Sequence, residues 1–230
     1  LSILKEFASK DPRVKIIDKD NAGYGHSMNI GMDMASGEYI GILESDDYVL
    51  PDMFRTLYET AKENDLDFVK SDFYRFYGEG EKLKTEYNRV ARTENNYNTI
   101  IYPKEDQQCF KFIMNTWCGI YNTEFLRKNI IRHNETPGAS YQDNGFWFKT
   151  NVFAKRTMYI PEAFYMNRRD NPNSSVYNPE KVYCANTEYQ LIYEFLEEYN
   201  IKEDFLEVYN YKKYHTYMFT LKRIAPKFRK

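Results

Sequence analysis

Three carboxylates stand within four residues, at Glu44, Asp46 and Asp47, directly after the apolar run at residues 39–43. Carboxylates packed this closely repel one another, so their joint ionisation requires solvent, cationic partners or a divalent metal. Ligands of open α/β sheets bind beyond the carboxyl ends of the strands, so this pattern indicates a binding edge. The alternative for the acids taken alone is a solvated loop before the next helix.

The pattern on both sides of the acids predicts helices and strands in alternation, which is typical of an α/β fold with a mostly parallel sheet flanked by helices. Helices are expected over residues 1–8, about 26–35 and from Pro51, and strands over 14–17, 39–43 and 67–76. Further along, a loop is expected at residues 78–99, a helix at 107–115 and a short strand at 116–121. An extended segment is expected at residues 158–168 and a helical part at 179–221.

The overall composition excludes several classes of protein. The chain has 230 residues and a formal net charge of -2, so bulk electrostatics gives no reason to expect a nucleic-acid partner. Its three cysteines are widely spaced without a CxxC pair, which indicates reduced thiols in a cytoplasmic protein rather than a disulfide frame or zinc site. No apolar run is long enough to span a membrane.

The run NAGYGHSMNIGMDMASGEYIGILESDD, at residues 21–47, closely resembles the central signature of the family-2 glycosyltransferases, which are inverting enzymes of the GT-A fold. Later segments agree with the same family: residues 115–121, Gln142-Asp143 before an aromatic helix, and residues 165–168 followed by Ser174 and Ser175. The resemblance covers about residues 1–175 and lacks the family's first strands. It implies a GT-A-like (Rossmann-like) core over residues 1–177, N-terminally truncated, and a helical extension over residues 178–230.

The resemblance implies a donor site built on the acidic turn. Glu44 takes the position that often contacts the ribose, Asp46 that of the main ligand of Mg²⁺ or Mn²⁺, and Asp47 lies beside it. For Asp47, a turn residue that orients the following helix is a nearly equal alternative. The other donor-binding candidates are Gly23, Gly25, Asn29, Arg168 and Arg169, and surface solvation is the alternative for the two arginines.

An inverting transfer needs a base that takes the proton of the acceptor hydroxyl. By resemblance, Asp143 is that base, and Gln142 and Trp117 are acceptor-binding candidates. Asp143 has a structural alternative, because Ser140-x-x-Asp143 also resembles a capping box, and Trp117 has one as a core residue.

The resemblance thus implies a bacterial-type, metal-dependent glycosyltransferase that moves a sugar from a nucleotide sugar, expected to be a UDP-sugar, to a glycan or lipid-linked saccharide. One alternative is a non-catalytic remnant that binds nucleotide or glycan. A phosphoryl or nucleotidyl transferase is disfavoured, because no P-loop lysine or phosphate-binding glycine loop is present. The basic C-terminal end, residues 222–230, indicates contact with anionic lipid or a solvated helix end.

Overall fold

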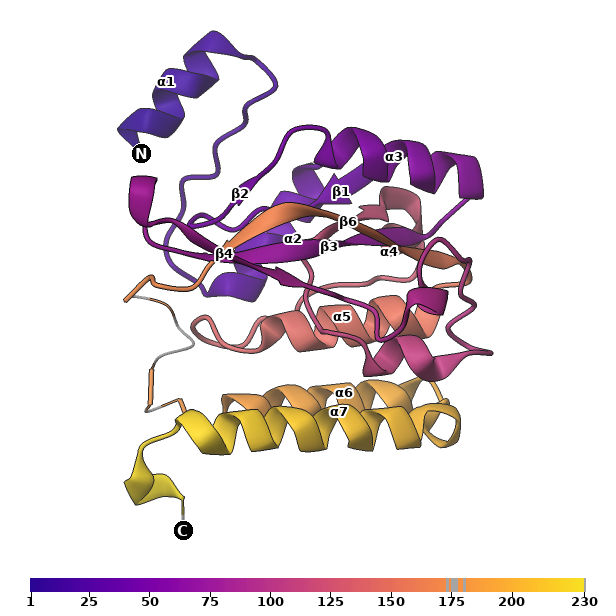
Figure 1. The fold of residues 1–230 in the computed structure, drawn as a ribbon. Helices are drawn as coiled ribbons and strands as arrows, with labels where there is room; N and C mark the ends of the chain where they lie inside the picture. Colours follow the sequence, from indigo (N-terminus) through magenta and orange to yellow (C-terminus); the bar gives the residue numbers. More distant parts are fainter. Residues whose placement is uncertain (173, 175–177, 180, 230) are drawn as a thin grey trace.

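The computed structural model describes residues 1–172, 174, 178–179 and 181–229. A curled sheet lies between α3 on one side and α5 on the other, and the hairpin of α6 and α7 forms a further layer beyond α5 (Figure 1). The helices are α1 Ser2–Lys10, α2 Tyr24–Met34, α3 Met53–Asn64, α4 Thr123–Lys128, α5 Gln142–Phe153, α6 Cys184–Glu198 and α7 Lys202–Arg223. The strands are β1 Tyr39–Gly41, β2 Tyr48–Val49, β3 Phe68–Tyr77, β4 Lys84–Asn88, β5 Gly119–Asn122 and β6 Thr157–Arg168.

The strand order is β1-β5-β3-β6-β2, with β4 paired to β3. The GT-A-like α/β class is confirmed, but the expectation of mostly parallel strands is wrong for the described sheet. Only β3 and β6 run parallel, while the other four pairs are antiparallel. Of the antiparallel pairs, only β3 and β4 are consecutive strands joined by a short loop. The other three pairs join strands that are far apart in the sequence, and the parallel pair is joined by a long crossover that contains α4 and α5.

The core is built on β3, whose first six residues are all buried. The helix α3 covers it with Met53, Leu57 and Ala61, which are spaced four residues apart and therefore lie on one face. From the other side, α5 contributes Phe146, Trp147 and Phe148 to the same cluster. The sheet is thus closely packed on both faces, which gives the loops at its edges a fixed base.

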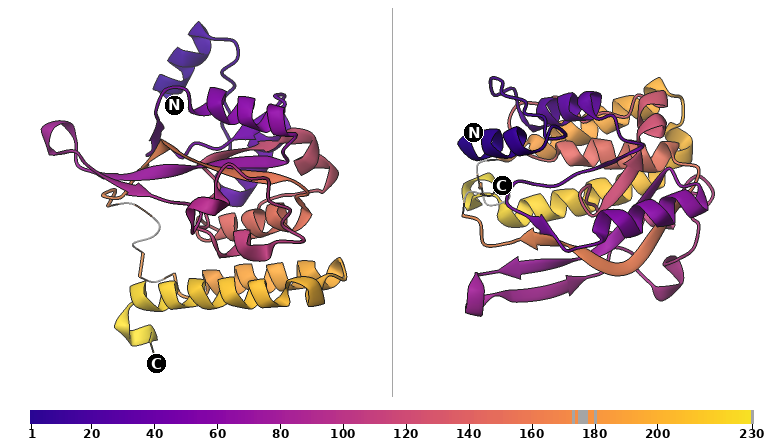
Figure 2. Two further views of the ribbon diagram at one scale, coloured as in Figure 1. Left: turned by 45° about the vertical axis from the view of Figure 1, so that its right-hand side comes forward. Right: turned by 90° about the horizontal axis from the view of Figure 1, so that it is seen from above.

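Three segments differ from the expectation. Residues 14–17 form no strand in the described chain, because Val14 and Ile17 stay exposed and have no strand partner. The expected loop at 78–99 contains β4, which projects with β3 as a hairpin (Figure 2). No alternation announces this strand, because its first four residues are all exposed. The expected helix at 107–115 is a short 3-10 helix, Gln107–Lys111.

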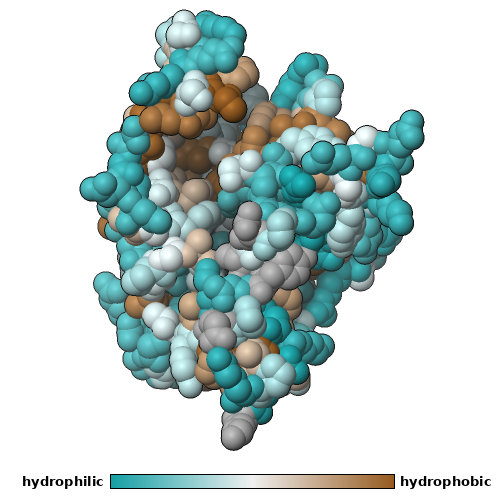
Figure 3. All heavy atoms as spheres, turned by 90° about the vertical axis from the view of Figure 1, so that its left-hand side faces the viewer, coloured by the Kyte–Doolittle hydropathy of each residue, from teal (hydrophilic) through white to brown (hydrophobic). Residues whose placement is uncertain are grey.

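The first helix does not pack into the core, since none of its residues is buried and Ile3, Leu4 and Phe7 remain exposed. One face of the molecule is hollowed, and hydrophobic side chains gather around the hollow (Figure 3).

Among the described residues, no helix has the length and apolarity needed to cross a bilayer. The expected boundary between core and extension, at residues 177 and 178, falls on the edge of the undescribed residues 175–177, and Ser175 also lies outside the description.

Candidate functional site

The acidic turn follows β1 directly. Ile42 is buried in the core and anchors the end of the strand, and the Asp47 amide donates to the Glu44 carbonyl at 3.2 Å, which closes the turn. β2 then pairs antiparallel with β6, so the turn lies against the last residues of β6. As a result, Glu44 is partly buried while Asp46 is exposed.

The carboxylate of Asp47 accepts three hydrogen bonds from within the protein. It accepts from the Tyr165 hydroxyl at 2.8 Å, from Asn167 Nδ2 at 3.0 Å and from the Arg168 amide at 2.7 Å. Burial raises the pKa of Asp47, and these three hydrogen bonds oppose that rise. These contacts give Asp47 a structural role, but they fix the acidic turn to β6, whereas the expected alternative was a turn residue that orients the following helix.

Glu44 lies between two tyrosines. The Tyr24 hydroxyl donates to Glu44 Oε1 at 2.7 Å, and the Glu44 amide donates to the Tyr165 hydroxyl at 3.1 Å. Burial is the main cause that raises the pKa of Glu44, and the negative charges of Asp143, Asp47 and Asp46 add to it. The charge of the expected base, Asp143, therefore influences the ionisation of Glu44, although the two residues are 99 positions apart in the sequence.

Asp143 lies in the first turn of α5. The capping-box alternative is wrong, because the N-cap residue is Tyr141, in left-handed conformation, and its side chain makes no capping hydrogen bond. Burial raises the pKa of Asp143, while a hydrogen bond from Asn144 Nδ2 at 3.2 Å and the charge of Lys70 lower it. The negative charge of Asp143 also raises the pKa of Tyr24, as does that of Glu44. Tyr24 also links the two elements by contact, because its hydroxyl donates to Glu44 and its amide donates to the Gly138 carbonyl, which accepts from Gln142 as well. The acidic turn and the start of α5 therefore meet at Tyr24.

The surroundings of Asp46 differ from those of Asp47. It is exposed and accepts a hydrogen bond from Asn171 Nδ2 at 2.7 Å. No group of three or more metal-binding side chains exists among the described residues. A hard cation such as Mg²⁺ can be bound by one or two carboxylates together with substrate phosphates, so a single exposed carboxylate fits this mode.

The expected cationic clamp is already engaged. Arg168 Nε donates to Asp170 Oδ1 at 2.8 Å, and its guanidinium also contacts Glu79 at 3.4 Å. The charge of Asp46 is among the causes that raise the pKa of Arg168, so this arginine lies near the acidic turn. The amide of Arg169 donates to the Phe76 carbonyl at 3.0 Å and continues the pairing of β6 with β3.

Three donor-binding candidates contact the loop at residues 133–138. A Cβ on Gly23, which has φ +93°, would lie 3.1 Å from the carbonyls of Gly138 and Thr136, and one on Gly25 would overlap the Asn134 carbonyl. The Asn29 side chain donates to the His133 carbonyl at 3.0 Å and accepts from the His133 amide at 3.0 Å. These residues seat the start of α2, and hence Tyr24, against the loop.

The two acceptor-binding candidates also have internal contacts. Gln142 is buried, and its amide accepts from the Ser140 amide and donates to the carbonyls of Thr136 and Gly138. The Trp117 ring is partly buried and lies 4.3 Å from the Tyr165 ring, between centroids. Tyr165 contacts both Glu44 and Asp47, so Trp117 contacts the acidic turn indirectly, through the Tyr165 ring.

Sequence reasoning missed Tyr24, Tyr165 and Lys70. Lys70 is 1% exposed on β3, where it donates to the Asn115 carbonyl, and burial lowers its pKa to about 8. A lysine inside an apolar strand pattern was a usable signal, because a buried lysine requires a compensating partner. The tyrosines gave no such signal among 22 of their kind.

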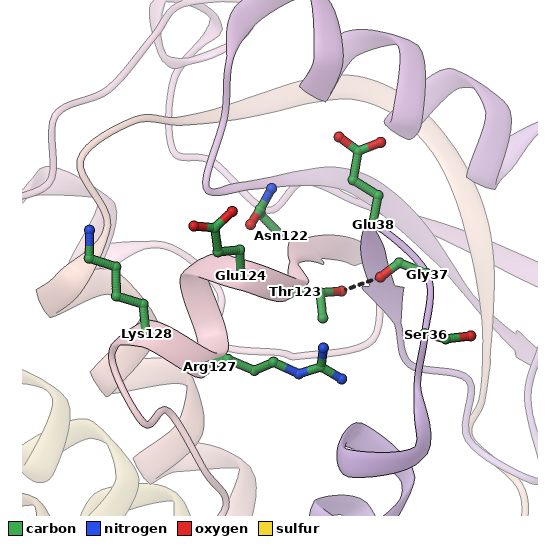
Figure 4. Close-up of a pocket in the computed structure, with 8 residues that line it drawn as sticks. All are labelled: Ser36, Gly37, Glu38, Asn122, Thr123, Glu124, Arg127 and Lys128. Carbon is green, nitrogen blue, oxygen red and sulfur yellow. Dashed lines mark hydrogen bonds between the residues drawn. The ribbon is translucent and has the colours of Figure 1, made fainter.

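Two pockets lie elsewhere. One, of about 730 Å³, is lined by residues of the β1 edge and of α4, among them Glu38, Thr123 and Arg127 (Figure 4). Some of its polar groups are paired within the protein: the Thr123 hydroxyl donates to the Gly37 carbonyl at 2.7 Å, and Glu38 pairs with Lys62. The other, of about 450 Å³, shares Glu38. Neither pocket includes an expected site residue.

A mixed, curled sheet with an acidic turn after one strand and an acid at the start of a facing helix is the architecture of the GT-A glycosyltransferases. The family model "Glycosyl transferase family 2" matches residues 1–129, and the chain belongs to this family.

Curated relatives agree with this family. EpsJ of Bacillus subtilis strain 168, named an uncharacterized glycosyltransferase, is 31% identical over 183 residues, which cover 78% of this chain and 51% of EpsJ. Glycosyltransferase GlyG of Streptococcus pneumoniae is 37% identical over 179 residues, 73% of this chain and 56% of GlyG. Among solved structures, TarS 1-349 of S. aureus in complex with UDP-GlcNAc superposes with a TM-score of 0.61 at 20% identity, covering 83% of this chain and 52% of TarS. The chain thus spans about half the length of these proteins.

Proposed function

We propose that the protein transfers a sugar, with inversion, from a nucleotide-sugar donor to a hydroxyl of a glycan or lipid-linked saccharide. The observation that carries the proposal is the position of Tyr24 between the acidic turn and the start of α5. Its hydroxyl donates to Glu44, and its amide donates to the Gly138 carbonyl, which also accepts from the side chain of Gln142, the residue before Asp143. Family membership supports glycosyl transfer in general. The TarS structures contain UDP-GlcNAc in one case and UDP in another, which supports a UDP-sugar as donor.

The roles follow from exposure and partners. Glu44 is placed to accept a hydrogen bond from a donor hydroxyl, while Tyr24 holds one of its oxygens. Asp46, exposed on the turn, would hold Mg²⁺ or Mn²⁺ together with donor phosphates, and the ion would neutralise charge on the departing diphosphate. We assign Asp47 to fixing the turn rather than to direct ligation, because three donors already occupy its carboxylate.

Asp143 is proposed to take the proton of the acceptor hydroxyl. A base on the face opposite the leaving group lets the acceptor oxygen attack that face, which inverts the anomeric centre. Burial raises the pKa of Asp143, so its carboxylate is a better proton acceptor than an exposed aspartate. Lys70, buried in the sheet, opposes this rise and keeps the carboxylate available in ionised form.

A panel of nucleotide sugars tests this function on the complete protein. With Mn²⁺ present, the right donor is expected to raise Tm, because ligands that bind only the folded state stabilise it by mass action. Release of nucleoside diphosphate then separates an enzyme from a non-catalytic binding remnant. A protein whose Tm is unchanged by every nucleotide sugar would contradict the proposal.

We further propose that the C-terminal end lies at the inner face of the membrane. No Asp or Glu follows Glu207, and α7 exposes Met218 and Leu221 on the same face as the exposed Lys222, because three- and four-residue spacings lie on one side of a helix. Basic and apolar side chains on one helix surface are typical of interfacial helices.

The K222E/K227E variant is expected to bind vesicles that contain phosphatidylglycerol at least roughly tenfold more weakly than the unaltered protein does, since each basic residue contributes about 1 kcal/mol near such a surface. Co-sedimentation at low and high salt measures this, with phosphatidylcholine vesicles as the control. Equal binding of the two proteins, or no binding by either, would contradict a lipid contact.

A further inference from the structure

A buried polar cluster lies where α6 meets α5. Glu188 on α6 is 1% exposed, and its Oε1 accepts from the Gly145 amide and from Asn134 Nδ2, both at 2.9 Å. Lys149 Nζ donates to Asn134 Oδ1 at 3.1 Å, which brings a cation to the cluster. Burying a carboxylate lowers the free energy of unfolding unless the group is hydrogen-bonded or paired, so we ask which parts of the fold the Glu188 contacts hold in place.

The first use is at the start of α5. Gly145 is the fourth residue of that helix, and its amide donates to Glu188 Oε1. Glu188 is therefore fixed to the beginning of α5, two residues beyond Asp143. A Cβ on Gly145 would lie 2.6 Å from Glu188 Oε1 and 2.6 Å from Asn134 Nδ2, so only glycine admits this approach.

The second use is at the loop that carries Asn134. The Asn134 carbonyl lies against Gly25, and the Tyr24 amide donates to the Gly138 carbonyl at 2.9 Å. Tyr24 in turn holds Glu44 through its hydroxyl. A continuous set of contacts therefore runs from Glu188 through Asn134 and the start of α2 to the acidic turn.

We propose that Glu188 is a positioning residue for glycosyl transfer: it fixes the first turn of α5, and with it Asp143, relative to the turn that carries Glu44. The inference rests on the proposed function. The α6–α7 hairpin would then contribute to the active site, because α6 supplies the carboxylate that connects the start of α5, which carries Asp143, to the loop beneath the acidic turn.

Electrostatics supports a direct effect on the base. Burial is the first cause that raises the pKa of Glu188 to about 7, and the charge of Asp143 adds to it, while Lys149 and the two hydrogen bonds oppose it. Glu188 Oε2 has no hydrogen-bond partner among the described residues, so it is free to take the proton. The charged groups that face Glu188 are Asp143 and Lys149 of α5; from α7, the Tyr209 hydroxyl donates to the neighbouring Tyr189 carbonyl at 3.0 Å.

The coupling of the two acids gives a pH signature. The charges of Asp143 and Glu188 repel each other, and burial raises the pKa of Glu188 to about 7. Above that pH, the second negative charge increases the proton affinity of Asp143 and favours proton transfer. The kcat profile of the unaltered protein is therefore expected to rise again through pH 7.

Two variants test the inference on the complete protein. Glu188→Gln keeps an oxygen for the Gly145 amide but cannot ionise, so it should keep kcat at pH 6 and lose the rise near pH 7. Glu188→Ala removes the hydrogen bonds, so kcat should fall roughly 10- to 100-fold at every pH with the donor KM unchanged. Glu194→Gln, an exposed change on the same helix, is the control and should match the unaltered protein.

A second readout needs no turnover. In carboxyl NMR, Glu188 should titrate near pH 7, and Asp143→Asn should lower that midpoint because the neighbouring charge is gone. A folded Glu188→Ala protein with normal kcat, or a Glu188 midpoint that ignores Asp143→Asn, would overturn the inference. Loss of donor binding and kcat together in Glu188→Ala would reduce Glu188 to a folding role and overturn it also. Absence of turnover in the unaltered protein would overturn the proposed function instead, and the NMR midpoint would still decide this inference.

Discussion

Asp143→Asn is expected to lower kcat by roughly 10²- to 10⁴-fold, which is the usual contribution of a positioned general base. The amide keeps the shape of the side chain but cannot accept the proton of the acceptor hydroxyl. Because Glu44 and the acidic turn are untouched, donor binding should be kept. Rates of nucleoside diphosphate release, measured beside the nucleotide-induced rise in Tm, separate the two effects.

The same variant has an internal control in its stability. Burial raises the pKa of folded Asp143 above its ordinary value, so the free energy of unfolding falls as the pH rises from the ordinary pKa to the folded pKa and stays lower above it. At pH 7, Asp143→Asn removes that cost, and its Tm should equal or exceed that of the unaltered protein. In the unaltered enzyme, kcat should fall on the acid side at a pH above the ordinary pKa of aspartate. Full activity of Asp143→Asn would remove Asp143 from the mechanism.

Asp46→Ala is expected to lower kcat/KM by at least about 100-fold, since a bound cation contributes several kcal/mol of charge stabilisation in the transition state. The loss should shrink as Mn²⁺ is raised, because the donor phosphates still offer ligands. Tm without nucleotide should hardly change, as Asp46 is exposed and Asn171 Nδ2 is the partner of its carboxylate at 2.7 Å. Initial rates across a Mn²⁺ series measure the effect.

The neighbouring Asp47→Ala provides the matched contrast. It leaves the Tyr165 hydroxyl, the Asn167 amide and the Arg168 amide without their acceptor, which costs about 1–3 kcal/mol for each donor that stays buried. Asp47→Ala should therefore lower Tm, whereas Asp46→Ala should not. Equal Tm and equal rates in the two variants would contradict the different roles given to these adjacent acids.

The sequence was sufficient where a motif is local and ordered. The α/β class, the strand before the acids and the helix that begins near Asp143 could all be predicted, because their residues lie within short windows. The direction of the strands could not be read this way, since it depends on which distant strands pair. The outer strand of the β3–β4 hairpin was missed because exposed residues leave no apolar alternation.

The limits within the site have the same physical origin. Gly23, Gly25 and Asn29 were expected to face a donor, and the structure places them against a loop more than 100 residues away. Glu188 lies 43 residues from its partner Gly145, and a glutamate in an amphipathic helix pattern is normally assigned to the exposed face. Long-range contacts between polar groups, unlike apolar periodicity, leave no local pattern.

The α6–α7 hairpin bears on how this family can be recombined. Glu188 contacts the beginning of α5, so a chimera joined after β6 would combine the helix that carries Asp143 from one parent with the carboxylate that binds this helix from another. Such hybrids should fold yet work poorly unless the glycine and the glutamate are inherited together. Grafting of acceptor preference between relatives therefore calls for a junction before α5, so that the helix and its hairpin travel as one block.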